Sequence, residues 1–162
     1  MTCMELRPIG VIHTPFACAP GTPIQSSRAE GAEGTVDVFP EFAQALQDLD
    51  GFDRAWLIYW FDRAAEPKLL VRPYLDDRPH GLFATRAPVR PNPIGMSPVR
   101  LLRIEGCRLF LADVDMLDST PLLDIKPYVP AFDHLPADRI GWLTGKVPQP
   151  QRADARFERG GV

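Results

Sequence analysis

Short alternating runs of apolar and polar residues, separated by proline and glycine, make up most of this sequence and predict strands rather than long helices. These runs lie at 6–12, 35–39, 69–72, 82–86, 98–104, 108–116 and 121–126. Residues 98–104 and 108–116 are joined by a short segment containing Gly106, which predicts a hairpin. Residues 55–61 (AWLIYWF) are apolar on both faces and predict a central strand that is covered on both sides.

Helical spacing is confined to two short segments. Residues 40–49 begin with proline and carry apolar residues at helical spacing, which predicts one amphipathic helix. Residues 138–144 predict a second, shorter helix. The connections 18–34 and 63–79 are long, and the first is expected to be functional because loops of this length are uncommon inside a domain. The tail from Lys146 is polar and is expected to be frayed.

The composition indicates one domain that is mainly β (α+β). A chain of 162 residues with 45% apolar residues can bury a substantial core. Its 18 prolines are poorly tolerated inside helices and central strands, which favours many turns and short elements. We assign residues 1–145 to this domain and 146–162 to a polar C-terminal tail.

Charge and cysteine content narrow the possible functions. The net charge of −3 gives no bulk electrostatic reason to expect nucleic acid, so such a role needs a local basic patch. The 3 cysteines and 3 histidines are widely scattered, so neither a disulfide framework nor a metal site is expected. The sequence has no signal-peptide pattern and no apolar run that could span a bilayer, and we expect a cytoplasmic protein without a membrane partner. The glycine motifs of dinucleotide folds and phosphate loops are absent.

The densest candidate site is residues 86–102 (RAPVRPNPIGMSPVRLL). Prolines crowd between two predicted strands there, and Arg86, Arg90 and Asn92 are presented from the turn. Proline has no backbone donor, so such a stretch leaves carbonyl oxygens and polar side chains free to bind a ligand. A rigid structural turn explains the same pattern equally well.

A second candidate site lies in residues 118–130 (DSTPLLDIKPYVP). The period of two along a strand puts Asp124, Lys126 and Tyr128 on one face. A carboxylate, an ammonium group and a phenol on one face can orient and deprotonate a substrate nitrogen. The alternative is a solvated strand face on which Asp124 and Lys126 form a surface ion pair.

Five segments together resemble the TrmO/YaeB (TsaA-like) methyltransferase family. In order along roughly residues 6–130, they are IGVIHTPF (9–16), WLIYWF (56–61), FATR (83–86), RPNPIGMS (90–97) and DSTPLLDIKPY (118–128). The pairing of RPNPIG with a downstream DIKPY is specific. The chain resembles the short form of the family, without the C-terminal extension of longer members.

The resemblance implies an antiparallel β-barrel with one or two short helices and long loops. It implies a homodimer that binds S-adenosyl-L-methionine near the subunit interface and methylates the exocyclic nitrogen of threonylcarbamoyl-adenosine beside the anticodon of tRNA. The cofactor contacts implied by matching positions are Pro23, Ile24, Gln25, Asp62, Arg63, Arg86, Asp118, Ser119, Thr120 and Pro121.

Methyl transfer to nitrogen needs an aligned lone pair and an acceptor for the proton, so positioning and one modest base suffice. Asp124 is the candidate base, and Tyr128 and Asn92 are candidates for orienting the substrate. Charge-assisted bonds to a carboxylate or phosphate are expected from Lys126, Arg86 and Arg90.

Two positions depart from the family pattern, and two alternative functions stay open. Ile24 stands where several relatives carry arginine, and Ser119 replaces a frequent glycine. The alternatives are a methyltransferase of the same fold acting on a small molecule or another RNA, and a non-catalytic module that binds S-adenosylmethionine. A shared surface of arginines would favour tRNA. The arginines in question are Arg72, Arg78, Arg86, Arg90, Arg100 and Arg103.

Overall fold

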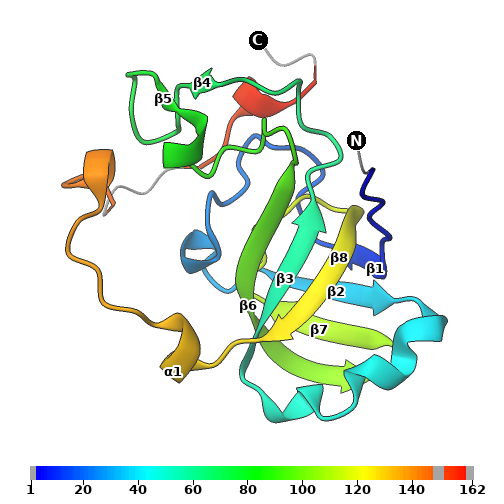
Figure 1. Cartoon of the computed structure of the whole chain (residues 1–162). Coiled ribbons are helices and arrows are strands. Elements are labelled where there is room, and N and C mark those ends of the chain that lie inside the picture. Colours follow the sequence, from blue (N-terminus) through cyan, green and yellow to red (C-terminus); the bar gives the residue numbers. More distant parts are fainter. Residues whose placement is uncertain (1–2, 148–151, 160–162) are drawn as a thin grey trace.

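Six strands close into an antiparallel barrel in the computed structural model, which describes residues 3–147 and 152–159 (Figure 1). Around the barrel the order is β1, β2, β7, β6, β3, β8. The strands are β1 (Gly10–His13), β2 (Glu33–Val38), β3 (Arg54–Trp60), β6 (Ile94–Glu105), β7 (Arg108–Ala112) and β8 (Thr120–Pro127). The expected antiparallel β-barrel is confirmed.

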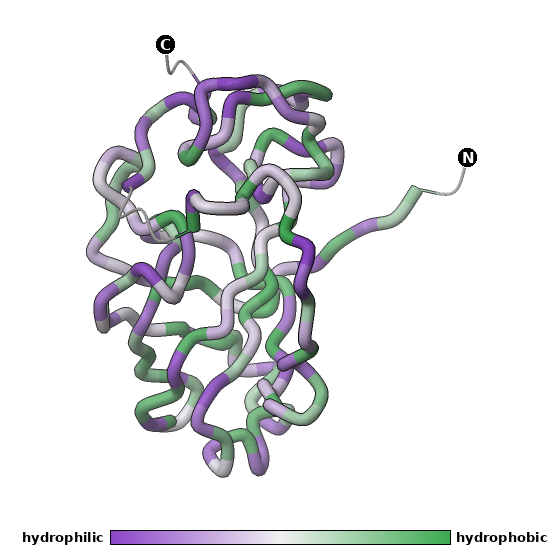
Figure 2. The backbone as a smooth tube through the Cα atoms, turned by 90° about the vertical axis from the view of Figure 1, so that its left-hand side faces the viewer, coloured by the Kyte–Doolittle hydropathy of each residue, from purple (hydrophilic) through white to green (hydrophobic). Residues whose placement is uncertain are grey.

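Apolar side chains fill the barrel because residues alternate between its two faces. Along β3, Leu57 and Tyr59 are buried, whereas Trp60 at the end of the strand is 43% exposed. Leu109 and Leu122 from other strands are also fully buried. Figure 2 shows hydrophobic and hydrophilic segments interspersed along the backbone. The interior of such a small barrel is occupied by side chains, so a ligand site must form outside it.

The sequence predicted that both faces of β3 are covered, but its outer face is partly exposed. Within the described residues, only its inner face is covered completely. Across the β3–β6 pair, Ile58 lies beside Met96 and Trp60 lies beside Ile94. Met96, Trp60 and Ile94 are exposed. We refer to this surface as the outer apolar face, formed by Trp56, Ile58, Trp60, Ile94 and Met96.

A small second lobe covers the end of the barrel at which β3 ends and β6 begins (Figure 1). It contains a two-stranded sheet of β4 (Leu70–Val71) and β5 (His80–Gly81). Val71 packs there with Leu82 and Phe157 in an apolar cluster separate from the barrel core. The barrel end and this lobe form the walls of the candidate site described below.

Helical segments are shorter and tighter than predicted. Residues 40–49 form a 3₁₀ helix, Pro40–Leu46, which stops before Asp48 because the φ of Asp48 is 67° and a left-handed residue cannot continue a right-handed helix. Residues 138–144 contain only the 3₁₀ turn Gly141–Leu143. The single α-helical turn in the described residues is α1 (Pro130–Asp133), which was not predicted. The further 3₁₀ turns are Ser26–Arg28, Leu49–Gly51, Leu82–Ala84 and Ala155–Phe157. No helix in the described residues is long and apolar enough to cross a membrane.

Strand boundaries moved for identifiable reasons. β6 begins at Ile94, inside the proline-rich segment, because residues 94–100 pair with β3. β7 ends at Ala112, earlier than the predicted 116, because Asp113 with a φ of 65° turns the chain away from the strand. Residues 82–86 were expected to be extended, but they open with a 3₁₀ turn.

Close packing of β3 against β6 depends on Gly95, which lies opposite Tyr59. A Cβ atom at Gly95 would lie 2.6 Å from Tyr59 Cζ and 2.8 Å from Phe61 Cζ, which is closer than van der Waals contact. We expect Gly95→Ala to lower the free energy of unfolding by about 2 kcal/mol, as overpacking of a core does. Denaturant unfolding measures this change, and Gly51→Ala is the control because its Cβ would meet no atom within 4 Å. Equal stabilities of Gly95→Ala and the wild type would contradict the prediction.

Candidate functional site

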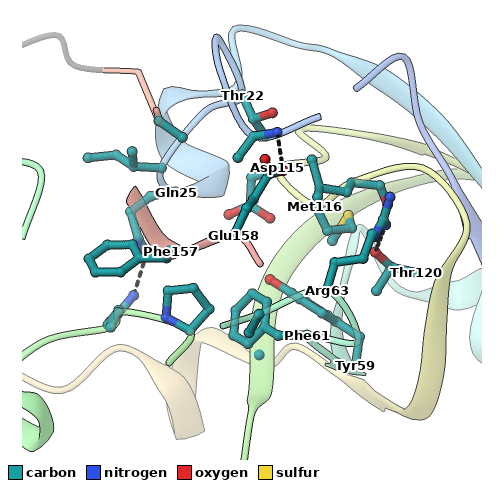
Figure 3. Close-up of a pocket in the computed structure, with 18 of the residues that line it drawn as sticks. Thr22, Gln25, Tyr59, Phe61, Arg63, Asp115, Met116, Thr120, Phe157 and Glu158 are labelled. Carbon is teal, nitrogen blue, oxygen red and sulfur yellow. Dashed lines mark hydrogen bonds between the residues drawn. The ribbon is translucent and has the colours of Figure 1, made fainter. Parts of the chain in front are cut away.

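A cavity of about 340 Å³ opens between the barrel end and the second lobe (Figure 3). Its volume is in the range of small-molecule sites in proteins. Segments far apart in the sequence supply its walls. They are residues 19–25, the end of β3 with 61–64, residues 85–96, residues 115–120 and the C-terminal residues 153–158.

Arg63 joins two of these walls. Its Nη2 atom donates hydrogen bonds to the carbonyl oxygen of Asp118 at 2.6 Å and to Thr120 Oγ1 at 3.3 Å (Figure 3). Its Nε atom lies 3.5 Å from Asp62 Oδ1, but it is buried and has no hydrogen-bond acceptor among the described residues. A buried donor without an acceptor is costly, and the ion pair with Asp62 offsets part of this cost.

Arg86 and Arg90 connect the long first loop with the proline-rich segment. Arg86 Nη1 donates to Gln25 Oε1 at 2.6 Å, which fixes the loop against the cavity. Arg90 Nη1 donates to the carbonyl oxygens of Thr85 at 3.0 Å and Ala87 at 3.3 Å. Among the described residues, neither guanidinium forms an ion pair with a carboxylate. Both arginines therefore retain a positive charge that an anionic ligand group could meet.

Asp115 places a carboxyl group in the cavity wall, and sequence reasoning did not select it. Ser97 Oγ donates to Asp115 Oδ1 at 2.5 Å, and Tyr59 Oη lies 3.0 Å from Ser97 Oγ. Burial raises the pKa of Asp115 to about 6, although the hydrogen bond from Ser97 and the charge of Arg86 act in the opposite direction. Burial also raises the pKa of Tyr59. No local signal marked it, because Asp113, with its left-handed backbone, ends the alternation of Leu109 and Leu111 before residue 115.

The raised pKa of Asp115 has a consequence for stability. The folded chain binds this proton more tightly than a solvated aspartate with a pKa of 3.8 does, so the ionised form destabilises the fold. This penalty is absent below about pH 4, grows as the pH rises toward 6, and is fully present above that value.

The C-terminal segment 152–159 is packed against the cavity, so the prediction of a frayed tail is wrong for these residues. Ala153 N donates to Thr22 O at 2.8 Å, and Phe157 O accepts from Ala65 N at 2.8 Å. Glu158 Oε1 accepts from the amide of Ala19 at 2.8 Å. The apolar side chain of Phe157 explains the docking, because it is only 6% exposed in the cluster of the second lobe. The tail is mostly polar in composition, which is why the sequence did not indicate that Phe157 anchors it.

Most of the cofactor contacts implied by the resemblance line the cavity. Those that do so are Pro23, Ile24, Gln25, Asp62, Arg63, Arg86 and Thr120, together with the candidate substrate residue Arg90. Asp118, Ser119 and Pro121 flank Thr120 without lining it. Burial raises the pKa of Asp118, but hydrogen bonds from Thr14, Ser119 and His13 outweigh this and lower it. Ser119 has a φ of 65°, a conformation that glycine adopts without strain, which explains a glycine at the matching family position.

The candidate catalytic residues lie elsewhere, since none of Asn92, Asp124, Lys126 and Tyr128 lines the cavity. Asp124 and Lys126 share the outside of β8, opposite Ile58 and Trp56 of β3. Their side chains are 46% and 63% exposed and form an ion pair at 2.9 Å. The ring of Tyr128 lies 5.7 Å from that of Trp56. Both the predicted shared face and the alternative surface ion pair are therefore present, beside the outer apolar face.

A smaller hollow of about 250 Å³ lies between the 3₁₀ helix Pro40–Leu46 and β8. Its lining includes Asp124 and is otherwise mostly apolar. In the described part of the chain, no group of three or more His, Cys, Asp or Glu side chains is arranged to hold a metal ion.

Comparison with known proteins assigns this geometry to one family. Residues 11–134 match the model of the tRNA-methyltransferase O N-terminal domain. A Pyrococcus abyssi protein described as a probable S-adenosyl-L-methionine-binding protein is 55% identical over 153 residues, covering 93% of this chain and 83% of the relative. The tRNA (adenine(37)-N6)-methyltransferase of Mus musculus is 33% identical over 134 residues, covering 78% of this chain and 31% of the mouse protein.

Solved structures agree with this assignment. The crystal structure of TrmO from Pseudomonas aeruginosa superposes with a TM-score of 0.73 at 38% sequence identity. The match covers 87% of this chain and 63% of that chain. The chain thus spans most of its Pyrococcus relative but under two thirds of the Pseudomonas structure.

Removal of the Phe157 side chain tests the role of the C-terminal segment. We expect Phe157→Ala to lower the free energy of unfolding by about 3 kcal/mol, because it leaves a cavity in the cluster of the second lobe. Limited proteolysis should also cleave within 152–159 faster than in the wild type. Phe132→Ala is the matched control, because Phe132 is 75% exposed and its truncation should change stability by less than about 0.5 kcal/mol. A Phe157→Ala variant as stable as this control would show that the segment is not anchored there.

Proposed function

Because this chain belongs to the tRNA-methyltransferase O family, we propose that its cavity binds S-adenosylmethionine and that the chain transfers the methyl group to tRNA. The proposed acceptor is the exocyclic nitrogen of threonylcarbamoyl-adenosine beside the anticodon. The cavity is the observation that carries the proposal, because it gathers charged and apolar groups from separate segments on one small volume.

The residues around the cavity fit the chemical groups of this cofactor. Its carboxylate would be met by Arg86. The carboxyl group of Asp115 in the cavity wall would be available to its positive charges. Its flat adenine ring can pack on aromatic side chains, and Phe61 and Phe157 line the cavity. All of the residues named here belong to the cavity of one chain.

When bound, the cofactor supplies a methyl group on a positively charged sulfur. The chain has to hold the acceptor nitrogen in line and accept its proton, which positioning and one base achieve. We assign the base to Asp124 and the orientation of the substrate to Tyr128 and Asn92. Lys126 Nζ lies 2.9 Å from Asp124 Oδ2 and so contacts the proposed base directly.

Asp124 does not line the cavity of its own chain, and this separation supports a homodimer. An exposed apolar patch on a β-sheet commonly marks an interface. The outer apolar face lies beside Asp124, Lys126 and Tyr128, so a second copy docked there would bring its own cavity toward these residues. A twofold arrangement would then supply two equal sites, each with residues from both chains.

The arginines that bear on tRNA binding divide into two groups. Arg100 pairs with Asp113 at 2.8 Å and Arg103 with Glu105 at 2.7 Å, so both arginines are held in ion pairs on the barrel, and Asp113 is shared with Arg54. Among the described residues, the other four form no ion pair with a carboxylate. They are Arg72, Arg78, Arg86 and Arg90, and the last two line the cavity. Unpaired positive charge around the cavity supports a phosphate-binding surface despite the overall charge of −3.

Methylation of tRNA by the purified chain is the direct test. With labelled S-adenosylmethionine and bulk tRNA carrying its modifications, we expect label in threonylcarbamoyl-adenosine after nucleoside analysis. Asp124→Asn should lower the single-turnover rate by roughly 10²-fold or more with the cofactor saturating. Asp50→Asn, which replaces an exposed aspartate away from the cavity, should leave the rate unchanged. Label in another RNA or a small molecule, or bound cofactor without transfer, would replace this acceptor with the corresponding alternative function.

Disruption of the outer apolar face tests the dimer. Trp60→Glu puts a charge on that face, and we expect sedimentation to show monomers and methylation to be lost, because a buried unpaired charge is unfavourable. Leu102→Glu is the control, since Leu102 is 45% exposed on β6 beyond the face. A Trp60→Glu variant that stays dimeric would rule out this interface.

Shared sites also predict complementation between inactive variants. Mixing Arg86→Ala with Asp124→Asn should restore roughly a quarter of the wild-type activity, because about half of all dimers are mixed and each mixed dimer carries one intact site of two. Failure of the mixture to regain activity, with dimer exchange demonstrated, would place both residues in one chain's site.

A further inference from the structure

The carboxyl group of Asp115 is held in a fixed position in the cavity wall (Figure 3). Ser97, which is only 1% exposed, donates to it from β6, and Tyr59 of β3 completes a chain of hydrogen bonds from the barrel interior. The backbone amides of Ser26 and of Asp115 itself also act to lower the pKa of this carboxyl group. The hydrogen bond from Ser97 occupies one acceptor site of Asp115 Oδ1 and ties the group to the barrel.

The carboxylate of Asp115 accepts a hydrogen bond from Ser97 but has no positively charged partner in the described part of the chain. Among the described residues, no Lys, Arg or His nitrogen lies within ion-pair distance of it. Arg86 acts on it only at longer range, while its own Nη1 atom donates to Gln25. Arg63 is engaged with residues 118 and 120. A partly buried carboxylate without a counter-charge is unfavourable, so its presence in a ligand cavity points to a functional reason.

We propose that Asp115 is the counter-charge for the sulfonium of S-adenosylmethionine, and that it lets the site distinguish this cofactor from the neutral thioether left after methyl transfer. The inference rests on the proposed function, because it assumes that the cavity binds this cofactor. A sulfonium carries a permanent positive charge but no hydrogen that it can donate. It therefore needs a nearby negative charge rather than a free acceptor site, and Asp115 supplies that charge while its Oδ1 atom is held by Ser97.

Other carboxylates of the cavity fit this role less well. Asp62 lies 3.5 Å from the guanidinium of Arg63, so its charge is already compensated. Glu158 is carried by the C-terminal segment and accepts a hydrogen bond from the Ala19 amide. Asp115, in contrast, is fixed by the barrel itself through Ser97 and Tyr59. A rigid charge needs no reorganisation when the ligand binds, which strengthens its interaction with a cation.

Loss of the sulfonium charge during the reaction gives this arrangement a second consequence. Once the methyl group has left, the sulfur is neutral and the attraction to Asp115 disappears. The product should therefore bind more weakly than the cofactor, which favours its release and reloading of the site. A site that recognised only the adenine, ribose and amino-acid groups would bind both forms alike, because these groups do not change.

Isothermal titration calorimetry tests whether the site distinguishes the two ligands by charge or binds them alike. The full chain is titrated with S-adenosylmethionine and with S-adenosylhomocysteine, and no activity measurement is needed. We expect the wild type to prefer S-adenosylmethionine. Asp115→Asn should weaken binding of S-adenosylmethionine on the order of tenfold or more, and should change binding of S-adenosylhomocysteine less than about twofold. Glu158→Gln is the matched control, because it removes a different carboxylate from the same cavity and should leave the preference intact.

Asp115→Glu is the control for misfolding of the Asp115→Asn variant. It keeps the charge while disturbing the geometry, so it should retain a preference for S-adenosylmethionine even if both affinities fall. An equal loss of affinity for both ligands in Asp115→Asn, or no loss for either, would overturn the role of Asp115. A wild-type chain that binds neither ligand would instead overturn the proposed function itself, and with it this inference.

Discussion

Closure of the barrel is the constraint on which the rest of this structure depends. β1 pairs with β2 on one side and with β8 on the other, so that no strand edge of the barrel is left open. The enclosed volume is filled by side chains such as Leu57, Leu109 and Leu122. Because no room remains inside for a ligand, the loops and the second lobe at one end have to build the site.

At that end, a few buried polar groups transmit the rigidity of the barrel to the cavity. Gly95 leaves room for Tyr59, Tyr59 contacts Ser97, and Ser97 holds Asp115 in the cavity wall. A hydrogen-bonded chain of this kind positions a charge more accurately than a loop could. The opposite walls are loops, and the C-terminal segment anchored by Phe157 links them to the second lobe. The cavity therefore combines one rigid wall with walls assembled from distant segments.

The candidate catalytic residues and the cavity lie at separate places on the single chain. Cofactor-type residues gather at the cavity, whereas Asp124, Lys126 and Tyr128 lie on the outside of the sheet beside exposed tryptophan and methionine side chains. The proposed homodimer would account for both observations at once. It would cover the outer apolar face and also bring the two sets of residues together.

Local patterns in the sequence predicted the six strands of the barrel but not their exact ends, because alternation with a period of two and proline or glycine breaks depend only on neighbouring residues. The motif segments around Arg86 and Thr120 likewise pointed to residues that line the cavity. The helix at 40–49 was mispredicted because its end depends on the left-handed backbone of Asp48. Only the tertiary structure revealed the roles of Asp115 and Phe157, since one looks like a turn aspartate and the other lies in a polar tail. Burial and charge compensation arise between segments distant in sequence, and no local pattern records them.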